Sequence, residues 1–409
     1  MENIAITGLG VMSSLGHSVE EFCQNLSAAR VAVGPTPWNN EPGLENAWMS
    51  RVENFRAQDW MDERVAAGTD RFAQYAIAAA VQAVEASGIA ELDAERTAVV
   101  VGTSCAGVES IAESQRGLDL EGPSGVSRKL QIQAWPNMAA GQIALRWGLH
   151  GPLLTVSTAC ASSIDAMGVA ARLIERGEAD VAIAGGCDAA RTQVTLIAAG
   201  LYGMFQPQPD PLKACRPFNT ERFGVMGGEG AGMVILERAD RAQARGATIH
   251  GYLRGYACLS DGYHPSSSHP DGRWESRTME LAIADAGLPG GAGDIDALIA
   301  HGTGTQVGDT AEIRAINRVF GEREKPLRVA SIKGHVGHTA GAAGVMGLLA
   351  GLHSMNEAAL VPTAGTTEID PEAEFEVVIG QPAAGPIAAV QVNGFGFGGQ
   401  NASLVVTRN

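Results

Sequence analysis

The sequence predicts an α/β fold in which buried strands alternate with helices. Short apolar runs end in glycine- or serine-rich turns, as expected for strands covered on both faces; they are IAITGLG, TAVVVGTS, LLTVSTAC and DVAIAGGCD. Between them lie stretches such as FAQYAIAAAVQAVEASG, with a stripe of small apolar residues and a glycine at the end, which are typical of helices. This alternation indicates α/β architecture.

The same order of elements recurs later in the chain. GMVILERADRAQARGATIHGYLRGY predicts strand, helix and strand, and ESRTMELAIADAGL predicts a helix. DALIAHGTGT then predicts a strand, and AAVQVNGFGFGGQNASLVV a closing hairpin. Element order, without a strict repeat, therefore predicts two duplicated halves, residues 1–240 and 241–409. The proline-rich segment 206–216 predicts a surface loop.

Composition excludes several classes of protein. The 409 residues are 45% hydrophobic, which suffices for a large core, and the net charge of −16 disfavours nucleic acid and anionic membranes as partners. The six cysteines show no pairing pattern, which favours a reduced, cytoplasmic protein. We expect neither a secretory signal nor a membrane span, which would need about 20 apolar residues.

Cys160 is the first candidate for chemistry. It lies between an apolar run and the predicted helix SSIDAMGVAARLIE. Backbone amides and the helix dipole at such a turn are expected to lower the pKa of a thiol and favour a nucleophilic thiolate. A small core residue is an equally open interpretation, because Cys105 and Cys187 also follow predicted strands.

Two glycine-rich motifs carry the candidate histidines. HGTGTQVGD contains His301 and is either a ligand-binding loop or a glycine-rich turn, and it lacks the spacing of a phosphate loop. SIKGHVGHTAGAAG contains Lys333, His335 and His338. Zinc is disfavoured because no cysteine or carboxylate stands at ligand spacing, whereas a cation beside imidazoles suits thiolate or oxyanion stabilisation.

The motif NGFGFGGQNAS places Phe395 and Phe397 in a run of glycines. Amides in such a segment can serve an oxyanion hole, or the segment can be a tight hairpin with two aromatic plugs.

These motifs together resemble the β-ketoacyl–acyl carrier protein synthases, the elongating ketosynthases of the thiolase superfamily. Six motifs in one order cover nearly the whole chain: ITGLGVMSSLG, TACASS, RPFNTERFGVMGGEGAG, HGTGTQVGD, SIKGHVGHTAGAAG and NGFGFGGQNAS. The resemblance implies the five-layer αβαβα thiolase-like fold, built from two duplicated halves with the active site at their junction.

The resemblance also implies the site. Cys160 matches the acyl-accepting nucleophile, with His301, His338 and Lys333 as the other catalytic residues, and the amides of Cys160 and Phe397 match the oxyanion hole. Residues that match substrate-binding positions, or stand next to the acyl pocket, are Thr303, Thr305, Ser267, Cys105, Val225 and Phe395. His335 has no counterpart and receives no role.

The implied reaction is a decarboxylative Claisen condensation. A Cys-bound acyl chain condenses with malonyl-acyl carrier protein to give β-ketoacyl-acyl carrier protein, in fatty-acid or polyketide-like biosynthesis. The enzyme would be an acyltransferase with no metal and no cofactor beyond the carrier's phosphopantetheine. Its partners would be acyl carrier protein and a second subunit, either a copy or a chain-length relative, paired along LLTVST.

Some positions depart from the fatty-acid pattern. Phe223 and Val225 replace the usual aspartate and phenylalanine, and Gly347 stands where a glutamate usually orients the lysine. Glycine at 347, together with the HGTGT and SIK motifs, looks more like polyketide synthase ketosynthases. The expected carrier-docking surface has few cations, namely Arg64, Arg71, Arg128 and Lys129.

Four other interpretations stay open. The main alternative is a ketosynthase subunit that acts only within a heterodimer with a chain-length partner. A catalytically silent chain-length subunit is disfavoured by the retained Cys160, and a degradative thiolase by the absence of any cysteine after Cys258. A Cys–His hydrolase is the weakest of the four.

Overall fold

A large mixed sheet forms the centre of the computed structural model, which describes residues 4–408. Residues 1–3 and 409, the outer ends of the two predicted halves, lie outside the described residues. The strands, in order across the sheet, are β13 (Glu376–Val377), β11 (Arg328–Ala330), β10 (Ala297–Ile299), β15 (Ala389–Gly396), β16 (Gln400–Thr407), β9 (Gly251–Ser260), β1 (Ile4–Ser13), β8 (Gly230–Arg238), β6 (Val181–Asp188), β4 (Thr97–Gly102) and β5 (Leu153–Val156).

The sheet repeats one strand pattern on each side of the β1–β9 pair. On one side β5, β4 and β6 run parallel to one another, and β8 and β1 follow antiparallel. On the other side β11, β10 and β15 are parallel, and β16 and β9 follow antiparallel. The first group ends with β8 at Arg238 and the second begins with β9 at Gly251. The division at residue 240 itself stays a prediction.

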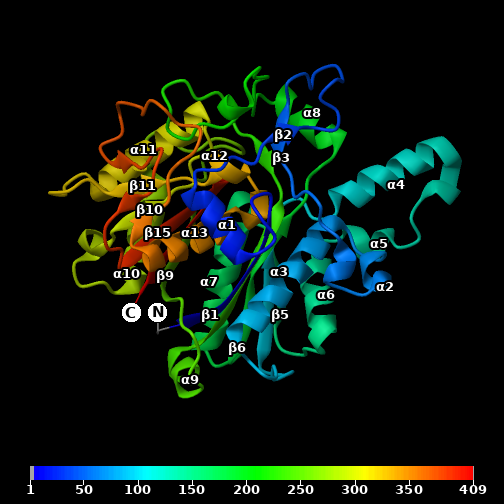
Figure 1. Ribbon diagram of the computed structural model, residues 1–409, viewed down its shortest axis with the longest axis horizontal. Coiled ribbons are helices and arrows are strands. Elements are labelled where there is room, and N and C mark those ends of the chain that lie inside the picture. Colours follow the sequence, from blue (N-terminus) through cyan, green and yellow to red (C-terminus); the bar gives the residue numbers. More distant parts are fainter. Residues whose placement is uncertain (1–3, 409) are drawn as a thin grey trace.

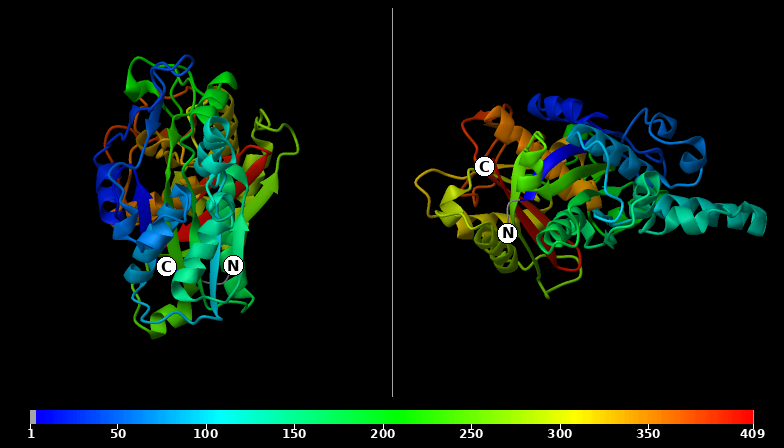
Figure 2. Two further views of the ribbon diagram at one scale, coloured as in Figure 1. Left: turned by 90° about the vertical axis from the view of Figure 1, so that its right-hand side faces the viewer. Right: turned by 90° about the horizontal axis from the view of Figure 1, so that it is seen from below.

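Helices cover both faces of each half of the sheet (Figures 1 and 2). The longer helices are α1 (Val19–Ser27), α3 (Arg71–Ser87), α4 (Val108–Glu121), α6 (Met138–Trp147), α7 (Ser162–Glu175), α8 (Gln193–Leu201), α10 (Arg273–Ala286), α11 (Gln306–Phe320) and α13 (Ala343–Glu357). The short helices are α2 (Glu63–Ala66), α5 (Leu130–Ala134), α9 (Ala239–Ala244) and α12 (Lys333–Val336). Two small sheets join β2 (Gly34–Pro35), β3 (Trp48–Ser50) and β7 (Gly227–Gly228), and β12 (Ala359–Leu360) and β14 (Ala383–Ala384).

Most of the apolar core lies in three clusters, which fill the spaces between the sheet and the helices on its two faces. One cluster lies between α3 and the first half of the sheet, and another between the second half and the pair α10 and α11. The largest surrounds α7 and α13, which contact strands of both halves and so lie between them. The order helix, sheet, helix, sheet, helix confirms the predicted αβαβα fold.

Glycines allow the two central helices to pack closely. A Cβ at Gly102, on β4, would lie 2.4 Å from the backbone carbon of Ser162 at the start of α7. A Cβ at Gly344 would lie 2.4 Å from Ile164, so α7 and α13 also touch each other closely. The Ser163 hydroxyl accepts a hydrogen bond from the Val345 amide at 3.0 Å, which satisfies one of the free amides at the start of α13.

The helix α4 projects from the body as an arm (Figure 1), and β5 is the edge strand of the large sheet on the side of the first half. Apolar side chains are exposed along this side of the molecule; they are Ile111, Leu118, Leu120, Ile132, Trp135, Leu145, Leu153 and Leu154. An open strand edge with apolar neighbours is typical of a surface that a second chain covers.

Two further expectations concern the surface. The segment 206–216 is largely exposed up to Lys213 and contains one turn of 3-10 helix, Pro211–Lys213, as expected for a surface loop. Among residues 4–408, no helix is long and apolar enough to cross a membrane.

Replacing Gly102 with alanine should destabilise the protein by about 3 kcal/mol, the upper range for overpacking, because the new methyl group would meet backbone that cannot move freely. Urea unfolding followed by circular dichroism measures this. Gly141, within α6, is the matched control: a Cβ there meets nothing within 4 Å, so G141A should stabilise by up to about 1 kcal/mol. Equal stability of G102A and wild type would contradict the close packing of α7.

Candidate active site

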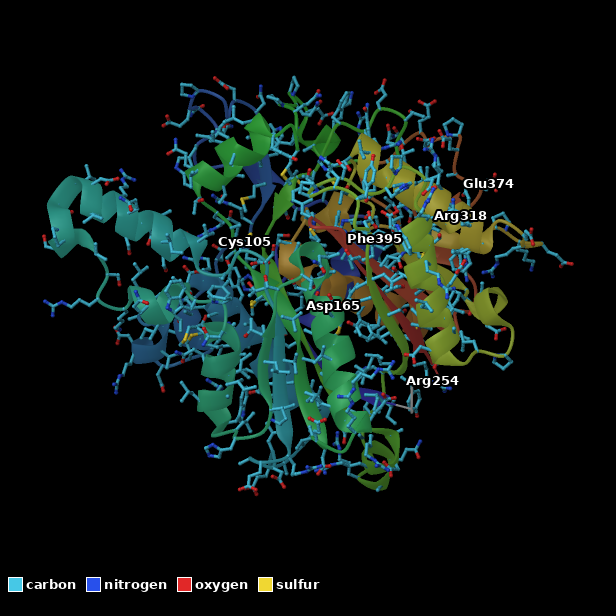
Figure 3. The ribbon with its side chains drawn as sticks, turned by 180° about the vertical axis from the view of Figure 1, so that it is seen from behind. Cys105, Asp165, Arg254, Arg318, Glu374 and Phe395 are labelled. Atoms are coloured by element: carbon cyan, nitrogen blue, oxygen red, sulfur yellow. The ribbon has the colours of Figure 1, made fainter. Side chains whose placement is uncertain are left out.

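The candidate residues meet where the parallel strands of both halves end. Cys105 follows β4 and Cys160 follows β5 in the first half, while His301 follows β10 and Lys333 follows β11 in the second. Carboxyl ends of parallel strands commonly form binding sites, because loops of different strands converge there. Figure 3 shows Cys105 and Phe395 near the middle of the molecule, where the arm joins the body.

Cys160 lies in a single turn of 3-10 helix, Ala159–Ala161, directly before α7. Ala159 has a left-handed backbone with a φ of 50°. This conformation is unfavourable for an L-residue and persists only where neighbouring groups stabilise it. The Ser162 hydroxyl does this, because it donates to the Ala159 carbonyl at 2.6 Å and accepts from the Thr158 amide at 2.9 Å. These two bonds fix the backbone turn that carries the thiol.

Two backbone amides point at the sulfur of Cys160, its own and that of Phe397. They come together because a glycine lets two backbones touch: a Cβ at Gly396 would lie 2.9 Å from the Cys160 nitrogen. Two preorganised N–H donors at one point are what an oxyanion needs.

His338 is in direct contact with the thiol. Its Nε2 lies 2.9 Å from Cys160 Sγ, and its Nδ1 accepts a hydrogen bond from the Ala340 amide at 3.2 Å. Because Nδ1 is an acceptor, the proton of the neutral ring lies on Nε2 and points at the sulfur. The ring nitrogens of His301 and His338 and the sulfur all lie within 4.8 Å of one another.

Lys333 fixes the tautomer of His301 in the same way. Its ammonium donates to the His301 carbonyl and lies 3.4 Å from His301 Nδ1. The proton of the His301 ring is therefore on Nε2, as in His338. The site thus presents two imidazole N–H groups and two backbone amides, all hydrogen-bond donors.

Burial sets the protonation states. It lowers the pKa of His338 to about 3 and that of His301 well below its ordinary value, with Lys333 as a further cause, so both rings are neutral at neutral pH. The expectation of a low thiol pKa was wrong: burial raises the pKa of Cys160 to about 11 and outweighs the charge of Lys333 and the two amides.

Three buried carboxylates hold the loops of the site, and two of them, Glu312 and Asp309, follow His301 in the sequence. None of the three was singled out from the sequence. Glu312 accepts from the amides of His301 at 2.8 Å and Gly302 at 2.6 Å. Asp309 accepts from the amide of Thr303 at 2.9 Å. Glu312 and Asp309 are part of the segment HGTGTQVGDTAE, so acidic residues that closely follow a glycine-rich loop were the available signal.

Asp188, at the end of β6, joins loops of the two halves. It accepts from the amide of Cys105 at 2.8 Å and from that of Gly341 at 2.6 Å. Gly341 lies in the turn Ala340–Ala342 between His338 and α13, so one carboxylate positions the loop of Cys105 relative to that of His338. Nothing in the pattern of DVAIAGGCD distinguished this aspartate from a strand end.

The predicted substrate-binding residues come from several loops around the site. Phe395 is 5.8 Å from the His301 ring, and the hydroxyls of Thr303 and Thr305 are 2.9 Å apart in the loop after His301. Val225 is buried beside Met226, whose carbonyl accepts from the His338 amide at 2.7 Å. Ser267 lies farther out, in the partly exposed loop 261–272.

The departures noted in the sequence have local explanations. A Cβ at Gly347 would meet Val392 at 3.1 Å and Ile299 at 3.3 Å, an apolar setting unsuited to a carboxylate. Glu312 is the carboxylate that most favours the charged form of Lys333. Phe223 is partly exposed with the Arg216 guanidinium 5.1 Å above its ring.

His335 faces away from the thiol. Its two ring nitrogens lie 2.7 Å from the carbonyl oxygens of Arg30 and Pro362, and it is fully buried. It therefore fastens the segment around residue 30 to the helix that carries Lys333.

The donor set does not suit a metal ion. Cys160, His301 and His338 are close enough to share one, but a metal would need the free lone pairs of both Nε2 atoms. The ring protons would then move to Nδ1, where they would face the Ala340 amide and the Lys333 ammonium, which are themselves donors. Metal-binding histidines normally donate that proton to an acceptor instead.

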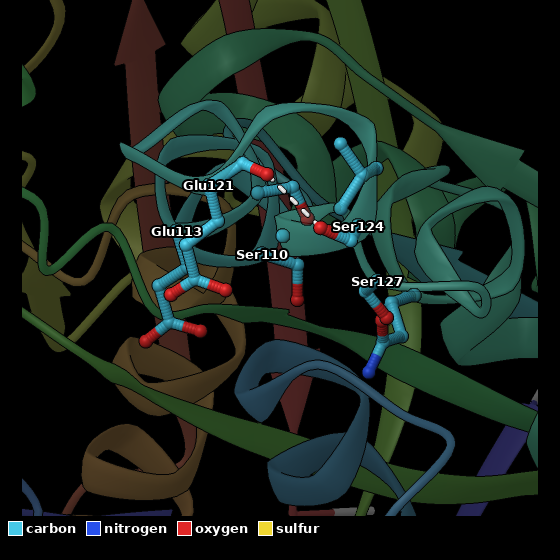
Figure 4. A pocket seen from close by; sticks show the side chains of 9 residues that line it. Ser110, Glu113, Glu121, Ser124 and Ser127 are labelled. Carbon is cyan, nitrogen blue, oxygen red and sulfur yellow. Dashed lines mark hydrogen bonds between the residues drawn. The ribbon is translucent and has the colours of Figure 1, made fainter. Parts of the chain in front are cut away.

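A hollow of about 410 Å³ lies beside α4, away from Cys160 (Figure 4). It is lined by hydroxyls and by the carboxylates of Glu113 and Glu121, with the Ser124 hydroxyl bonded to the Glu121 carbonyl at 2.9 Å. Its lining residues include no histidine, lysine or cysteine, so the nucleophilic chemistry belongs to the Cys160 site.

Comparison with known families and proteins gives consistent results. The family described as β-ketoacyl synthase, N-terminal domain, matches residues 1–242, and β-ketoacyl synthase, C-terminal domain, matches residues 250–367. The 3-oxoacyl-[acyl-carrier-protein] synthase 2 of Staphylococcus aureus (strain COL) is 35% identical over 407 residues, which are 99% of this chain and 98% of that protein.

Solved structures share the whole fold. The ishigamide ketosynthase/chain length factor has a TM-score of 0.92 and 32% identity, covering 100% of this chain and 99% of that one. A type II PKS acyl-carrier protein complex with its ketosynthase bound to the hexaketide (AntDE:AntF) has a TM-score of 0.91 and 25% identity, covering 100% of both chains.

The rate of Cys160 alkylation by iodoacetamide should rise about tenfold per pH unit from pH 7 to pH 10, because the thiolate fraction does so below a pKa of about 11. Mass spectrometry of the Cys160 peptide separates this reaction from that of the exposed Cys258. K333M should slow alkylation at each pH, because it removes the charge that favours the thiolate, whereas the exposed-site control K325M should not. A rate that levels off below pH 9 would contradict the raised pKa.

Proposed function

This chain belongs to the β-ketoacyl synthase family and is a condensing acyltransferase, and we propose that Cys160, His301, His338 and Lys333 are its catalytic residues. The reaction is the decarboxylative condensation of a Cys160-bound acyl chain with malonyl-acyl carrier protein. The observation that carries this assignment is that three hydrogen-bond donors, the Nε2–H of His338 and the amides of Cys160 and Phe397, meet at a single thiol, with His301 close by. That arrangement suits a reaction in which negative charge develops on oxygen twice.

The first step transfers the acyl group. The Cys160 sulfur attacks the thioester carbonyl of an acyl carrier protein, a C–S bond to Cys160 forms, and the bond to the carrier's arm breaks. The Nε2–H of His338 and the charge of Lys333 stabilise the attacking thiolate. The amides of Cys160 and Phe397 stabilise the tetrahedral oxyanion by hydrogen bonds. The proton of the thiol is transferred to the sulfur of the departing phosphopantetheine.

The second step forms the new carbon–carbon bond. A malonyl thioester loses carbon dioxide, and the enolate oxygen accepts the Nε2–H groups of His301 and His338. The enolate carbon attacks the acyl carbonyl on Cys160, whose oxyanion occupies the same two amides. Collapse expels the Cys160 thiolate, which takes up one proton. No metal or redox cofactor enters the proposal.

The remaining site residues bind the substrates. Thr303 and Thr305, with Ser267 farther out, bind the phosphopantetheine arm, while Cys105, Val225 and Phe395 border the acyl chain. Two contacts support this division. The Phe395 ring lies beside the His301 ring, and the Cys105 amide donates to Asp188, so both residues lie against loops of the active site.

The carrier protein docks near Arg64, Arg128 and Lys129, with Arg71 contributing less. Lys129 donates to the carbonyl of Ala67 at 3.2 Å, which brings the exposed Arg64 and Arg128 segments together. Arg71 already faces Glu109 at 3.8 Å. Acidic carrier proteins would be attracted by this cationic patch on a chain of net charge −16.

The functional unit is a dimer paired along β5, in the cytoplasm. The exposed edge and the apolar residues of the arm support this pairing. The second candidate is a ketosynthase subunit active only with a chain-length partner, which the likeness to the ishigamide ketosynthase/chain length factor favours. The two units 1–240 and 241–409 would each supply one half of the site.

Incubation with octanoyl-carrier protein should add one acyl group to the wild type and none to C160A, as measured by intact mass, because the thiol is the acceptor. Absence of an adduct on folded wild type, also after co-purification with a chain-length partner, would overturn the assignment of Cys160. An adduct only with that partner would favour the heterodimer.

H301A should still be acylated but should release carbon dioxide from malonyl-carrier protein about 10²–10³-fold more slowly, because it lacks one of two donors to the enolate. Measuring acylation and decarboxylation on the same preparation separates the two steps. Equal loss of both would argue against a role confined to the second step.

A further inference from the structure

Two segments of the second half are bonded to each other, and one of them contacts the sulfur of Cys160. One is the hairpin turn 397–399 between β15 and β16, and the other is the loop 261–272. The Gly398 amide donates to the Pro265 carbonyl at 2.7 Å, and the Asp261 amide donates to the Gly399 carbonyl at 2.9 Å. We call these two segments together the roof, because the Phe397 amide within it bonds the sulfur of Cys160.

Tyr202 contacts both parts of the roof from the first half of the chain. It is the residue at the end of α8, and its hydroxyl is hydrogen-bonded to the Ser266 hydroxyl. Its ring lies 6.4 Å from the Phe397 ring at an angle of 59°. The side chain is 61% exposed, so these contacts can break and form again without opening the core.

We propose that Tyr202 is a positioning residue that holds the roof closed over Cys160 and thereby controls access to the thiol. The hydroxyl contact restrains the loop next to Ser267, and the ring contact restrains the residue whose amide serves the sulfur. One side chain on the first half thus fixes both roof segments of the second. The inference rests on the proposed function only in taking Cys160 as the group that an acyl donor must reach.

The contacts of Tyr202 must break before the phosphopantetheine group of a carrier protein can reach Cys160. The Phe397 side chain is 45% exposed and its amide bonds the sulfur of Cys160, so a phosphopantetheine group that approaches the thiol from the surface passes this residue. The contact with Ser266 is one exposed hydrogen bond. Its loss should therefore change the open fraction of the roof by about 3- to 10-fold.

Access can be measured separately from thiol reactivity. Cys160 is alkylated with iodoacetamide and, in parallel, with a bulky fluorescein maleimide, and the Cys160 peptide is quantified by mass spectrometry. Both reagents need the thiolate, so a change in the pKa of Cys160 cancels in the ratio of the two rates. The ratio of bulky to small reagent reports the opening of the roof.

Y202F and S266A should each raise this ratio by the same factor of about 3 to 10, and the double variant should raise it no further, because both remove the same bond. Y202A, which also removes the ring contact, should raise it more. The neighbouring L201A is the matched control and should leave the ratio unchanged, since Leu201 is 86% exposed. Thermal melts establish that each variant is folded.

An unchanged ratio in Y202A, or additive effects of Y202F and S266A, would overturn the proposal. The measurement needs neither carrier protein nor condensation. Its failure is therefore distinguishable from failure of the proposed function, which is tested by acyl transfer to Cys160.

Discussion

The close packing of α7 and α13 between the two halves of the sheet is the constraint on which the site depends. Gly102 and Gly344 leave no room for side chains, so the two helices are held at one separation and one depth. Cys160 precedes α7 and His338 precedes the turn that leads into α13. A shift of either helix would therefore change the 2.9 Å contact between sulfur and imidazole directly.

Buried carboxylates hold the loops of the site in fixed positions relative to these helices. Asp188, Asp309 and Glu312 accept backbone amides, and they do so from the loops that bear Cys105, His301 and Thr303. Burial keeps the imidazoles neutral and the thiol protonated, so the resting site consists of hydrogen-bond donors around a nearly uncharged centre. Such a site is preorganised for negative charge that appears only during reaction.

Elements from both halves enclose the site, and each half contributes different parts of it. The second half supplies the roof and the histidines, while the first supplies the nucleophile, Tyr202 and the arm (Figure 1). The open edge of β5 and the apolar side chains of the arm lie on the side of the first half.

Sequence by itself determined the α/β class, the repeated order of elements and the motif residues, because strands and helices bury apolar side chains with different periods. It also placed Cys160 at a strand-to-helix turn, which the structure has. Only the tertiary structure decided the raised pKa of that thiol, since burial depends on groups distant in the chain. The same holds for Asp188, which joins the loop of Cys105 to the loop of Gly341, and for Tyr202, whose partners lie in the other half.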